Sequence, residues 1–395
     1  MSFRYLTNVS LDEAKEEYIN ALRKNGFAAK EETVSVAASC GRITSKAVYA
    51  NICAPHYLAS AMDGIAVSAK KTFGATETTP VVLSKDDYVI VDTGDPVPEN
   101  CDAVIMIEDV VNEDGGNVRL HAPATPWQHI RQIGEDICAG EMILPAKTKI
   151  TPSAIGAMLA GGVTEVSVIR KPVVGIIPTG DEIVPPTSNP GEGEIIEFNS
   201  SIISGMLGDW GAVPKVYPIV PDNYDLIKKT VTDASEECDM VILNAGSSAG
   251  RDDNSTAILG SVGKVLYHGI AIKPGKPAIL AYKDDKPLLG VPGYPVSAII
   301  VIDNLLKPLV YEWYDLPDDT AVYEEAVLSK SVVSGLKYRE FVRVRLGVVG
   351  GKMIASPLNR GAGVVSSFMK ADGILEVPQG REGFEAGETV RVKLL

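Results

Sequence analysis

Three loops in the second half of the chain combine residue types that could bind an anionic ligand. The first, 244–253, is rich in glycine, serine and alanine and ends in paired aspartates; the second carries Lys273 and Lys276 among prolines, and the third contains Pro292 and Gly293. Small residues let a ligand approach backbone N–H groups, lysines supply positive charge, and carboxylates can hold a divalent cation. The lysines could also be solvated loop residues, but flanking prolines stiffen their loop and suit a placed charge. Together the loops predict a site for a phosphorylated or otherwise anionic ligand.

The candidate ligand contacts in the first loop are its small residues, Gly246, Ser247, Ser248 and Gly250. This loop is not a Walker loop, because it lacks the Gly-Lys-Ser/Thr ending, and no glycine-rich loop of the chain has the spacing of a dinucleotide fingerprint. The sequence therefore argues against a P-loop NTPase, a kinase and a Rossmann dehydrogenase.

Acidic residues follow several predicted strands of the same half of the chain. They are Asp181, Glu182, Asp222, Asp252 and Asp253. The carboxyl ends of parallel strands meet at one edge of a sheet, so these side chains are expected to converge there. Asp222 taken alone is better explained as a helix cap, whereas acidic loops gathered at one edge favour a cation or ligand site.

Candidates elsewhere in the chain have two explanations each. Asp63 precedes a glycine, where an aspartate is more often a turn residue than a catalytic one. Thr93 lies in a Thr-Gly-Asp-Pro turn. Ser366 and Ser367 follow a Gly-Ala-Gly run and could contact an anion, although a polar turn explains them at least as well.

The first half of the chain predicts two helices around a β-rich segment. Ser10 and Glu13 form a capping box before a helix at 11–24, and Thr151 with Pro152 begins a helix that ends at Ala160. Runs of β-branched residues between 51 and 136 indicate a small β-rich domain. The two helices could together form a support that flanks this inserted domain.

From Lys171 onward strands and helices alternate, which is typical of a mostly parallel sheet with helices on both faces. The predicted strands are 173–178, 213–220, 240–243 and 288–291, and the predicted helices are 199–207, capped by Asn199 and Ser200, 224–238, and one from 296. After Pro317 alternating strand patterns return, and they predict a C-terminal β domain or barrel.

Composition narrows the class of protein. A chain of 395 residues is long enough for two to four domains, and its net charge of -14 argues against a nucleic-acid or anionic-membrane binder. Neither a signal-peptide core nor a membrane-length apolar run is present, so a cytoplasmic location is expected. The five cysteines are scattered without a C-x-x-C pair, and the four histidines lack metal-ligand spacing, so core thiols and structural histidines are expected.

These motifs together give the chain a close resemblance to the molybdopterin molybdenumtransferase family, called MoeA in prokaryotes and the E domain of gephyrin or Cnx1 in eukaryotes. The matching motifs occur in family order and cover nearly the whole chain. They are SAMDG at 60–64, TGDPVP at 93–98, RQIGED at 131–136, TGDE at 179–182, IKPGKP at 272–277 and VPGYP at 291–295.

The resemblance implies an elongated homodimer of four-domain subunits. The implied domains are a split helical domain at 1–50 and 137–170, an inserted β-rich domain at 51–136, a molybdopterin-binding three-layer α/β domain at 171–316, and a C-terminal β barrel at 317–395. The family cleft lies between the inserted domain of one subunit and the α/β and C-terminal domains of the other. Asp63 and Thr93 would then serve the partner's site.

The resemblance also implies a reaction in which adenylylated molybdopterin and molybdate, or tungstate, yield molybdenum cofactor and AMP with Mg²⁺. The implied catalytic positions are Asp63, Thr93, Glu182, Asp222, Asp253 and Lys273, with Glu182, Asp222 and Asp253 as the metal ligands. Lys276, Pro292, Gly293, Ser366, Ser367 and the small residues of the first loop would bind the pterin substrate. An adenylyltransferase is an implied partner protein.

Two positions depart from the family pattern, and two rival functions remain open. The chain has Ile65 where relatives often have tyrosine, and Gly269 where some carry a lysine, so anion binding relies on fewer cations. One rival is the preceding adenylylation of molybdopterin, although the inserted and C-terminal domains argue against it. The other rival is a non-catalytic pterin-binding scaffold, but no long linker or partner-binding tail is present.

Overall fold

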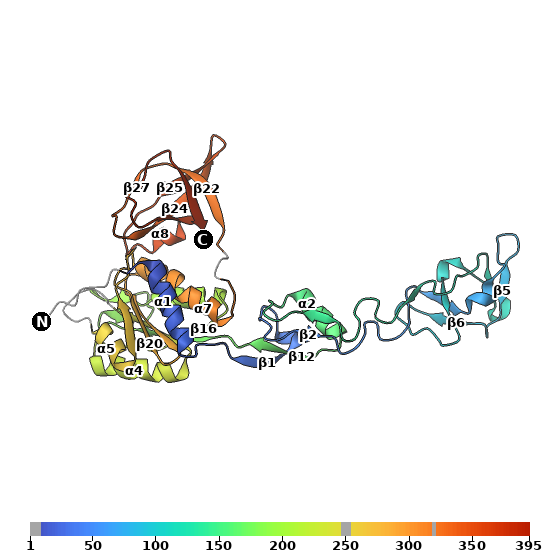
Figure 1. Ribbon diagram of the computed structural model, residues 1–395. Helices are drawn as coiled ribbons and strands as arrows, with labels where there is room; N and C mark the ends of the chain where they lie inside the picture. The colour runs from blue at the N-terminus through green and yellow to red at the C-terminus, as the bar shows by residue number, and fades with distance from the viewer. Residues whose placement is uncertain (1–8, 246–253, 318–320) are drawn as a thin grey trace. The chain divides into compact units, whose positions relative to one another are not determined.

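The computed structural model describes residues 9–245, 254–317 and 321–395. The chain forms two compact units: unit 1 combines Met1–Lys30 with Arg170–Leu395, and unit 2 is Glu31–Ile169 (Figure 1). Among the described residues, no helix has the length and apolar character needed to span a bilayer.

A parallel sheet forms the centre of unit 1. β13 (Val173–Pro178) pairs in parallel with β16 (Val213–Val216) on one side and β17 (Met240–Ala245) on the other, and β17 pairs in parallel with β21 (Lys286–Pro292). These strands are almost continuously apolar because both faces of a parallel sheet are covered. The predicted parallel α/β arrangement is confirmed, although the strand expected at 213–220 ends at Val216.

The far edge of this sheet is antiparallel, which the sequence pattern did not reveal. β20 (Ile279–Lys283) pairs antiparallel with β21, and β18 (Lys264–His268) pairs antiparallel with β20. Lys283 faces Lys286 across a two-residue turn in which Asp284 has a φ of 55°. Such a tight hairpin turn can only join antiparallel neighbours.

Helices cover both faces of the sheet (Figure 1). On one face α4 (Tyr224–Glu237) and α5 (Ser255–Val262) bury Ile227 and Leu259 against Val241 and Leu243. Alternate strand residues such as Ile242 point the other way and are also fully buried. The helices packed against that second face include α3 (Asn199–Asp209) and α6 (Pro295–Val301), which continues through a π-helical segment at 302–306 into α7 (Lys307–Trp313).

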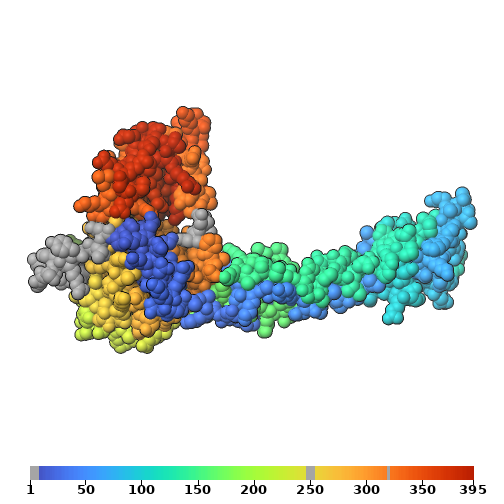
Figure 2. All heavy atoms as spheres, viewed as in Figure 1, coloured from blue at the N-terminus to red at the C-terminus, as the bar shows by residue number. Residues whose placement is uncertain are grey.

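The N-terminal helix α1 (Leu11–Lys24) belongs to unit 1. The hydroxyl of Ser10 accepts a hydrogen bond from the N–H of Glu13, as the capping pattern predicted. Tyr18 is buried, and its hydroxyl donates to the carbonyl of Ala281 at 2.6 Å, so α1 packs against the sheet (dark blue in Figure 2). Helix 11–24 was expected to pair with helix 151–160, but its apolar face is occupied by the α/β sheet.

The C-terminal strands close into a barrel, as the alternating pattern predicted. In order around the ring they are β24 (Arg339–Val349), β25 (Lys352–Pro357), β22 (Tyr323–Leu328), β28 (Thr389–Leu394) and β26 (Gly373–Val377), which pairs again with β24. β23 (Val332–Val333) pairs with β27 (Gly383–Phe384), and α8 (Ser366–Met369) lies between β25 and β26 in the chain. The short strand β19 (Ile272–Lys273) leaves the α/β part and pairs in parallel with β24.

Unit 2 has one helical part and one β-rich part along the chain. The helical part contains α2 (Pro152–Ala160), whose N-cap Thr151 accepts from the N–H of Ala154 as expected. Its strand pairs are β1 (Glu31–Ser35) with β12 (Glu165–Ile169), and β2 (Val48–Tyr49) with β11 (Met142–Leu144).

The β-rich part confirms the predicted strands of 51–136, with one difference. Its strand groups are β6 (Tyr88–Val91), β4 (Gly64–Val67) and β7 (Ala103–Met106); β5 (Val81–Leu83), β9 (Val118–Leu120) and β8 (Val110–Asn112); and β3 (Ala59–Ser60) with β10 (Ile130–Arg131). One β-branched run, predicted as a single strand at 103–111, contains two strands, because a 3₁₀ turn at Ile107–Asp109 separates β7 from β8.

Candidate functional site

The carboxyl ends of β13, β17 and β21 open into a cavity of about 750 Å³. Glu182, Pro292 and Gly293, all predicted from the sequence, line this cavity together with Asn244. Beside it runs the short parallel pair β14 (Ile183–Val184) and β15 (Ile195–Ile196). A cavity at this edge of the sheet is where an open α/β fold places a ligand.

An amide network that sequence reasoning missed braces this edge. The side-chain amide of Asn244 is buried and donates to the carbonyl oxygen of Pro292 at 3.0 Å. The amide of Asn199 donates to Asn244 Oδ1 at 3.0 Å and to the carbonyl of Gly293 at 2.8 Å. The network fixes the loop after β21 to the ends of β17 and α3.

Asn199 therefore does not cap α3, and the predicted capping role of Asn199 and Ser200 is wrong. Phe198 occupies the N-cap position, and the carboxylate of Glu197 accepts from the N–H of Ser200 at 2.8 Å. The Glu197 carboxylate thus accepts a hydrogen bond from a backbone N–H in the first turn of α3. The Asn199 amide is therefore available to bind Asn244 and the Gly293 carbonyl.

Two of the predicted acidic loops do meet. The carboxylate of Asp181 accepts from the backbone N–H of Asp222 at 3.0 Å, which joins the loops after β13 and β16. The N-cap of α4 is Asn223, whose side chain accepts from the N–H of Leu226. The capping explanation for Asp222 therefore does not apply.

The glycine-rich loop lies outside the described residues. It includes the candidates Gly246, Ser247, Ser248, Gly250, Asp252 and Asp253. Within the described ranges no group of three histidine, cysteine or acidic side chains forms a metal cluster. Glu182 and Asp222 are exposed residues of the loops after β13 and β16, and carboxylates are among the ligands that Mg²⁺ prefers.

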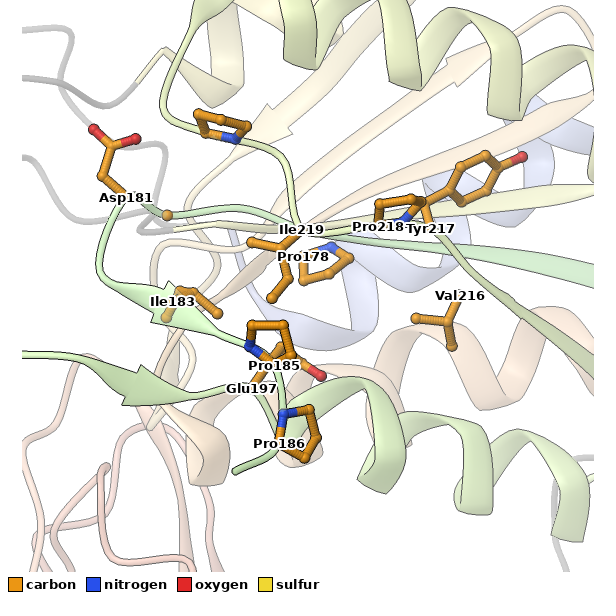
Figure 3. Close-up of a pocket in the computed structure, with 12 residues that line it drawn as sticks. Pro178, Asp181, Ile183, Pro185, Pro186, Glu197, Val216, Tyr217, Pro218 and Ile219 are labelled. Carbon is orange, nitrogen blue, oxygen red and sulfur yellow. The ribbon is translucent and has the colours of Figure 1, made fainter. Parts of the chain in front are cut away.

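A second cavity, of about 630 Å³, shares the lining residues Pro178, Ile183 and Glu197 with the first. Figure 3 shows proline rings such as Pro185 and Pro218 along it, with Asp181 at one end and Val216 and Tyr217 at the other. Its lining is mainly apolar, so it offers fewer groups that could orient a charged ligand.

Lys273 stands at the junction of the α/β part and the barrel. Its ammonium nitrogen lies 3.6 Å from a carboxylate oxygen of Glu340, to which Arg360 also donates, from Nε at 3.0 Å. The Glu340 side chain is only 3% exposed, whereas that of Lys273 is 57% exposed. The buried carboxylate can therefore hold both cations while leaving the lysine open to a ligand.

Arg343 places another buried cation next to α8, on the face of β24 opposite to Val342 and Val344, which belong to the barrel core. Its guanidinium is buried and donates to the hydroxyl of Ser367 at 3.1 Å and to the carbonyl of Asn359 at 2.7 Å. Burial and the nearby Arg360 lower the pKa of Arg343. Of the two predicted serines, Ser367 is thus committed to Arg343, while Ser366 is exposed.

The Lys276 loop is held by backbone geometry. Gly275 has a φ of 111°, and a Cβ there would lie 2.8 Å from a methyl carbon of Val301. Only glycine fits this close approach. The ammonium of Lys276 lies 5.6 Å from the ring centroid of Tyr338, which orients the side chain by a cation–π contact.

In unit 2 the structure brings Asp63 and Thr93 together. One carboxylate oxygen of Asp63 accepts from the backbone N–H of Thr93 at 2.6 Å and from its hydroxyl at 2.7 Å. These bonds lower the pKa of Asp63, the hydroxyl having the larger effect. Both residues are exposed, so a fixed and ionised carboxylate is presented at the surface.

The chain is a multidomain α/β protein with a cavity at the strand ends of a mostly parallel sheet, and the short strand that carries Lys273 pairs with an attached barrel. Three family models cover most of the chain. They are the MoeA N-terminal region (domain I and II) at 9–162, a probable molybdopterin binding domain at 175–312, and the MoeA C-terminal region (domain IV) at 325–395.

Individual relatives agree. A putative molybdopterin biosynthesis protein of Methanocaldococcus jannaschii is 31% identical over 93% of this chain and 92% of its own length. The molybdopterin molybdenumtransferase of Bacillus subtilis is 29% identical over 98% of this chain and 94% of its own. A crystal structure of the MoeA protein of Pyrococcus horikoshii matches with a TM-score of 0.80 and 30% identity, covering 98% of this chain and 99% of that one. The chain belongs to the MoeA family of molybdopterin molybdenumtransferases, and this membership supports a transferase role in molybdenum cofactor biosynthesis.

Proposed function

We propose that this protein inserts molybdate, or tungstate, into adenylylated molybdopterin and releases AMP. The observation that carries the proposal is the strand-end cavity, in which Glu182 and the Pro292–Gly293 loop lie together. An adenylylated pterin carries phosphate charge and flat rings, which suit a cavity with both apolar walls and polar strand ends.

The chain's own residues would act by holding charge and position. Lys273 and Lys276 would bind phosphate or oxyanion, and Lys273 is already oriented by Glu340. Asn244 and Asn199 would keep the loop after β21 in place while the substrate binds. No thiol of the protein is required, because the pterin supplies the dithiolene sulfurs.

Mg²⁺ fits the carboxylate character of the proposed ligands Glu182, Asp222 and Asp253. When bound, the cation would neutralise charge on the phosphate oxygens during P–O cleavage. Asp181 would support this arrangement by fixing the backbone at Asp222.

We also infer a homodimer in which Asp63 and Thr93 of one subunit serve the site of the other. The supporting observation is that their hydrogen-bonded pair presents a fixed carboxylate at the exposed surface of unit 2. An adenylyltransferase would supply the substrate as a separate partner protein.

The reaction can be tested by following AMP release from adenylylated molybdopterin with Mg²⁺ and molybdate. We expect AMP formation by the wild-type protein, about 100-fold less with Glu182→Gln, and little change with Glu192→Gln, an exposed glutamate of the same loop region. Asp253→Ala should abolish turnover but retain pterin binding. AMP formation no faster than without protein would refute the insertase, and pterin binding without turnover would favour a scaffold.

Two further measurements address the alternatives and the dimer. An adenylyltransferase would consume ATP with unmodified molybdopterin, so ATP consumption would favour that rival. If the sites are shared, mixing inactive Asp63→Asn and Glu182→Gln subunits should restore part of the activity, since a mixed dimer contains one site with neither substitution. Mixtures that stay inactive while exchanging subunits would rule out the shared site.

A further inference from the structure

Two cysteines face each other where the chain enters and leaves the β-rich part of unit 2. Residues 49–54 lead into that part and residues 137–142 lead out of it, and we call these two segments the neck. Tyr49 pairs with Met142 at one end of the neck, and Ala54 forms an antiparallel bridge with Ile137 at the other. Cys53 and Cys138 both lie within the neck.

The register of the neck sets these cysteines directly opposite one another. Ala54 and Ile137 exchange both backbone hydrogen bonds, at 2.8 and 3.2 Å, so they form a hydrogen-bonded pair. The next pair along an antiparallel ladder is Cys53 with Cys138, at a non-hydrogen-bonded position. Side chains at such positions approach most closely, at separations that overlap those of disulfide-linked residues.

The sulfur atoms point to the same place. A Cβ built on Gly134 would lie 3.0 Å from Cys138 Sγ and 3.5 Å from Cys53 Sγ. The thiol of Cys138 donates to the carbonyl of Gly134, and Cys53 Sγ accepts from the N–H of Ala139, the residue after Cys138. Both thiols therefore lie next to Gly134, on the same side of the neck. Both are free, Cys138 exposed and Cys53 partly exposed, so the expectation of core thiols is wrong for this pair.

We propose that Cys53 and Cys138 form a redox-active pair and are a modification site. A low-molecular-weight disulfide oxidises the two thiols to a Cys53–Cys138 disulfide bond, which reversibly links the two segments of the neck. One cysteine thiolate attacks the oxidant disulfide, forms a mixed disulfide and releases one thiol. The second cysteine then attacks the mixed disulfide and releases the other thiol, so two electrons and two protons pass from the cysteines to the oxidant. The bond closes a loop that contains the whole β-rich part, including Asp63 and Thr93.

The other cysteines provide internal controls. Cys101 and Cys238 are buried, and Cys40 is exposed and belongs to neither segment of the neck. Cys40 should therefore accumulate a stable mixed disulfide, because no second thiol is placed to resolve it. This difference separates a paired site from general thiol accessibility.

The test is peptide mapping of the full-length protein after incubation with excess oxidised glutathione. We expect a linked Cys53–Cys138 peptide that is lighter by two hydrogen atoms and free of glutathione, together with a glutathione adduct on Cys40. Dithiothreitol should reverse both. In Cys53→Ser, Cys138 should instead retain glutathione, and Cys40→Ser should leave the linked peptide unchanged. Glutathione retained on Cys138 of the wild-type protein, or unreacted thiols at both positions, would overturn the proposal.

A measurement on the reduced wild-type protein needs no substitution and no oxidant. A trivalent arsenical bridges two thiols only when their sulfur atoms lie close together. We expect one equivalent to be captured by the native protein and to block both Cys53 and Cys138 against alkylation, while Cys40 still reacts. Alkylation of the neck cysteines at the rate of Cys40 in the presence of the arsenical would contradict the geometry.

Discussion

The carboxylate of Asp63 accepts both the backbone N–H and the hydroxyl hydrogen bond of Thr93, at 2.6 and 2.7 Å, across thirty positions of sequence. Each residue taken singly was a plausible turn residue. Their contact makes one preorganised acidic group at the surface of unit 2, and several of the contacts in unit 1 can be tested in the same way.

Replacing Thr93 by valine should raise the pKa of Asp63 toward its ordinary value, because the hydroxyl is the larger cause of the lowering. A carboxylate whose pKa is lowered on folding stabilises the folded protein at pH values above its unfolded pKa. This stabilisation is lost as the pH falls through the folded pKa. Carboxyl-carbon NMR titration of selectively labelled protein measures the midpoint. Thr93→Ser, which keeps the hydroxyl, should retain the wild-type midpoint, whereas an unchanged midpoint in the valine variant would contradict the assignment.

Lys273→Met should separate ligand binding from stability. The lysine is mostly exposed and 3.6 Å from Glu340, so its loss should change the free energy of unfolding by less than about 1 kcal/mol. If Lys273 binds an anion of the substrate, AMP formation should fall about 100-fold. Urea unfolding and the AMP assay give the two numbers, and Lys264→Met, an exposed lysine of β18, is the matched control. Equal activity of the two variants would remove Lys273 from the site.

Asn244→Ala should destabilise unit 1 and weaken substrate binding together. The substitution leaves the Pro292 carbonyl and the Asn199 amide without their buried partner, a loss of about 2–3 kcal/mol. Because the same network holds the loop at the cavity, KM for the pterin substrate should rise. Asn25→Ala removes an exposed asparagine hydrogen bond at the end of α1 and should cost less than about 1 kcal/mol. A KM equal to that of the wild type would show that the network does not support the cavity.

Ser367→Ala should destabilise the barrel, whereas Ser366→Ala should not. The Ser367 hydroxyl accepts from the buried guanidinium of Arg343, and an unsatisfied buried charge-assisted donor costs about 1–3 kcal/mol. Ser366 is exposed, so its substitution should stay within about 0.5 kcal/mol. Chemical unfolding of both variants decides the point, and equal stabilities would mean that Arg343 is held by its backbone carbonyl partners alone.

Tyr18→Phe should show that α1 is anchored in unit 1. Its buried hydroxyl donates to the Ala281 carbonyl, and losing that bond should cost about 1–2 kcal/mol near neutral pH. Burial raises the pKa of Tyr18 well above 10.0, so the stability it contributes is fully present below the unfolded pKa and declines as pH rises above about 10. The phenylalanine variant should therefore lose less stability between neutral and alkaline pH. Tyr323→Phe, at an exposed tyrosine of β22, is the control, and parallel pH profiles for wild type and Tyr18→Phe would contradict the assignment.

Local sequence pattern was sufficient for elements whose residues interact with near neighbours. The helices at 11–24 and 152–160, the buried strand 173–178 and the C-terminal alternation were all predictable, because caps and periodicity are short-range properties. The motif order also identified the family. The hairpin at Asp284 was missed because its flanking strands are buried along most of their length, so no alternation marks them.

Tertiary structure alone decided which side chains meet. Asn199 reads locally as a helix cap, yet it binds Asn244 and Gly293 because Glu197 caps the helix instead. The alternating sequence pattern predicts that Arg343 lies on the polar face of a strand, yet its side chain is buried and donates to a backbone carbonyl and to the hydroxyl of Ser367. Neither contact has a local signal in the sequence. The residues that Asn199 and Arg343 bind lie far away along the chain, and Glu197 takes the capping role that the local sequence suggests for Asn199.

The sequence by itself determined the residue types of the site: carboxylates after strands, lysines between prolines, and glycine where a side chain cannot fit, as at Gly275. These follow from backbone sterics and charge, which each short segment carries with it. Only the fold decided that Lys273 faces a buried Glu340, that Asp63 binds Thr93, and that the sulfur atoms of two cysteines in the neck of unit 2 both lie next to Gly134. Distances between remote segments depend on strand register and packing, and no single segment encodes them.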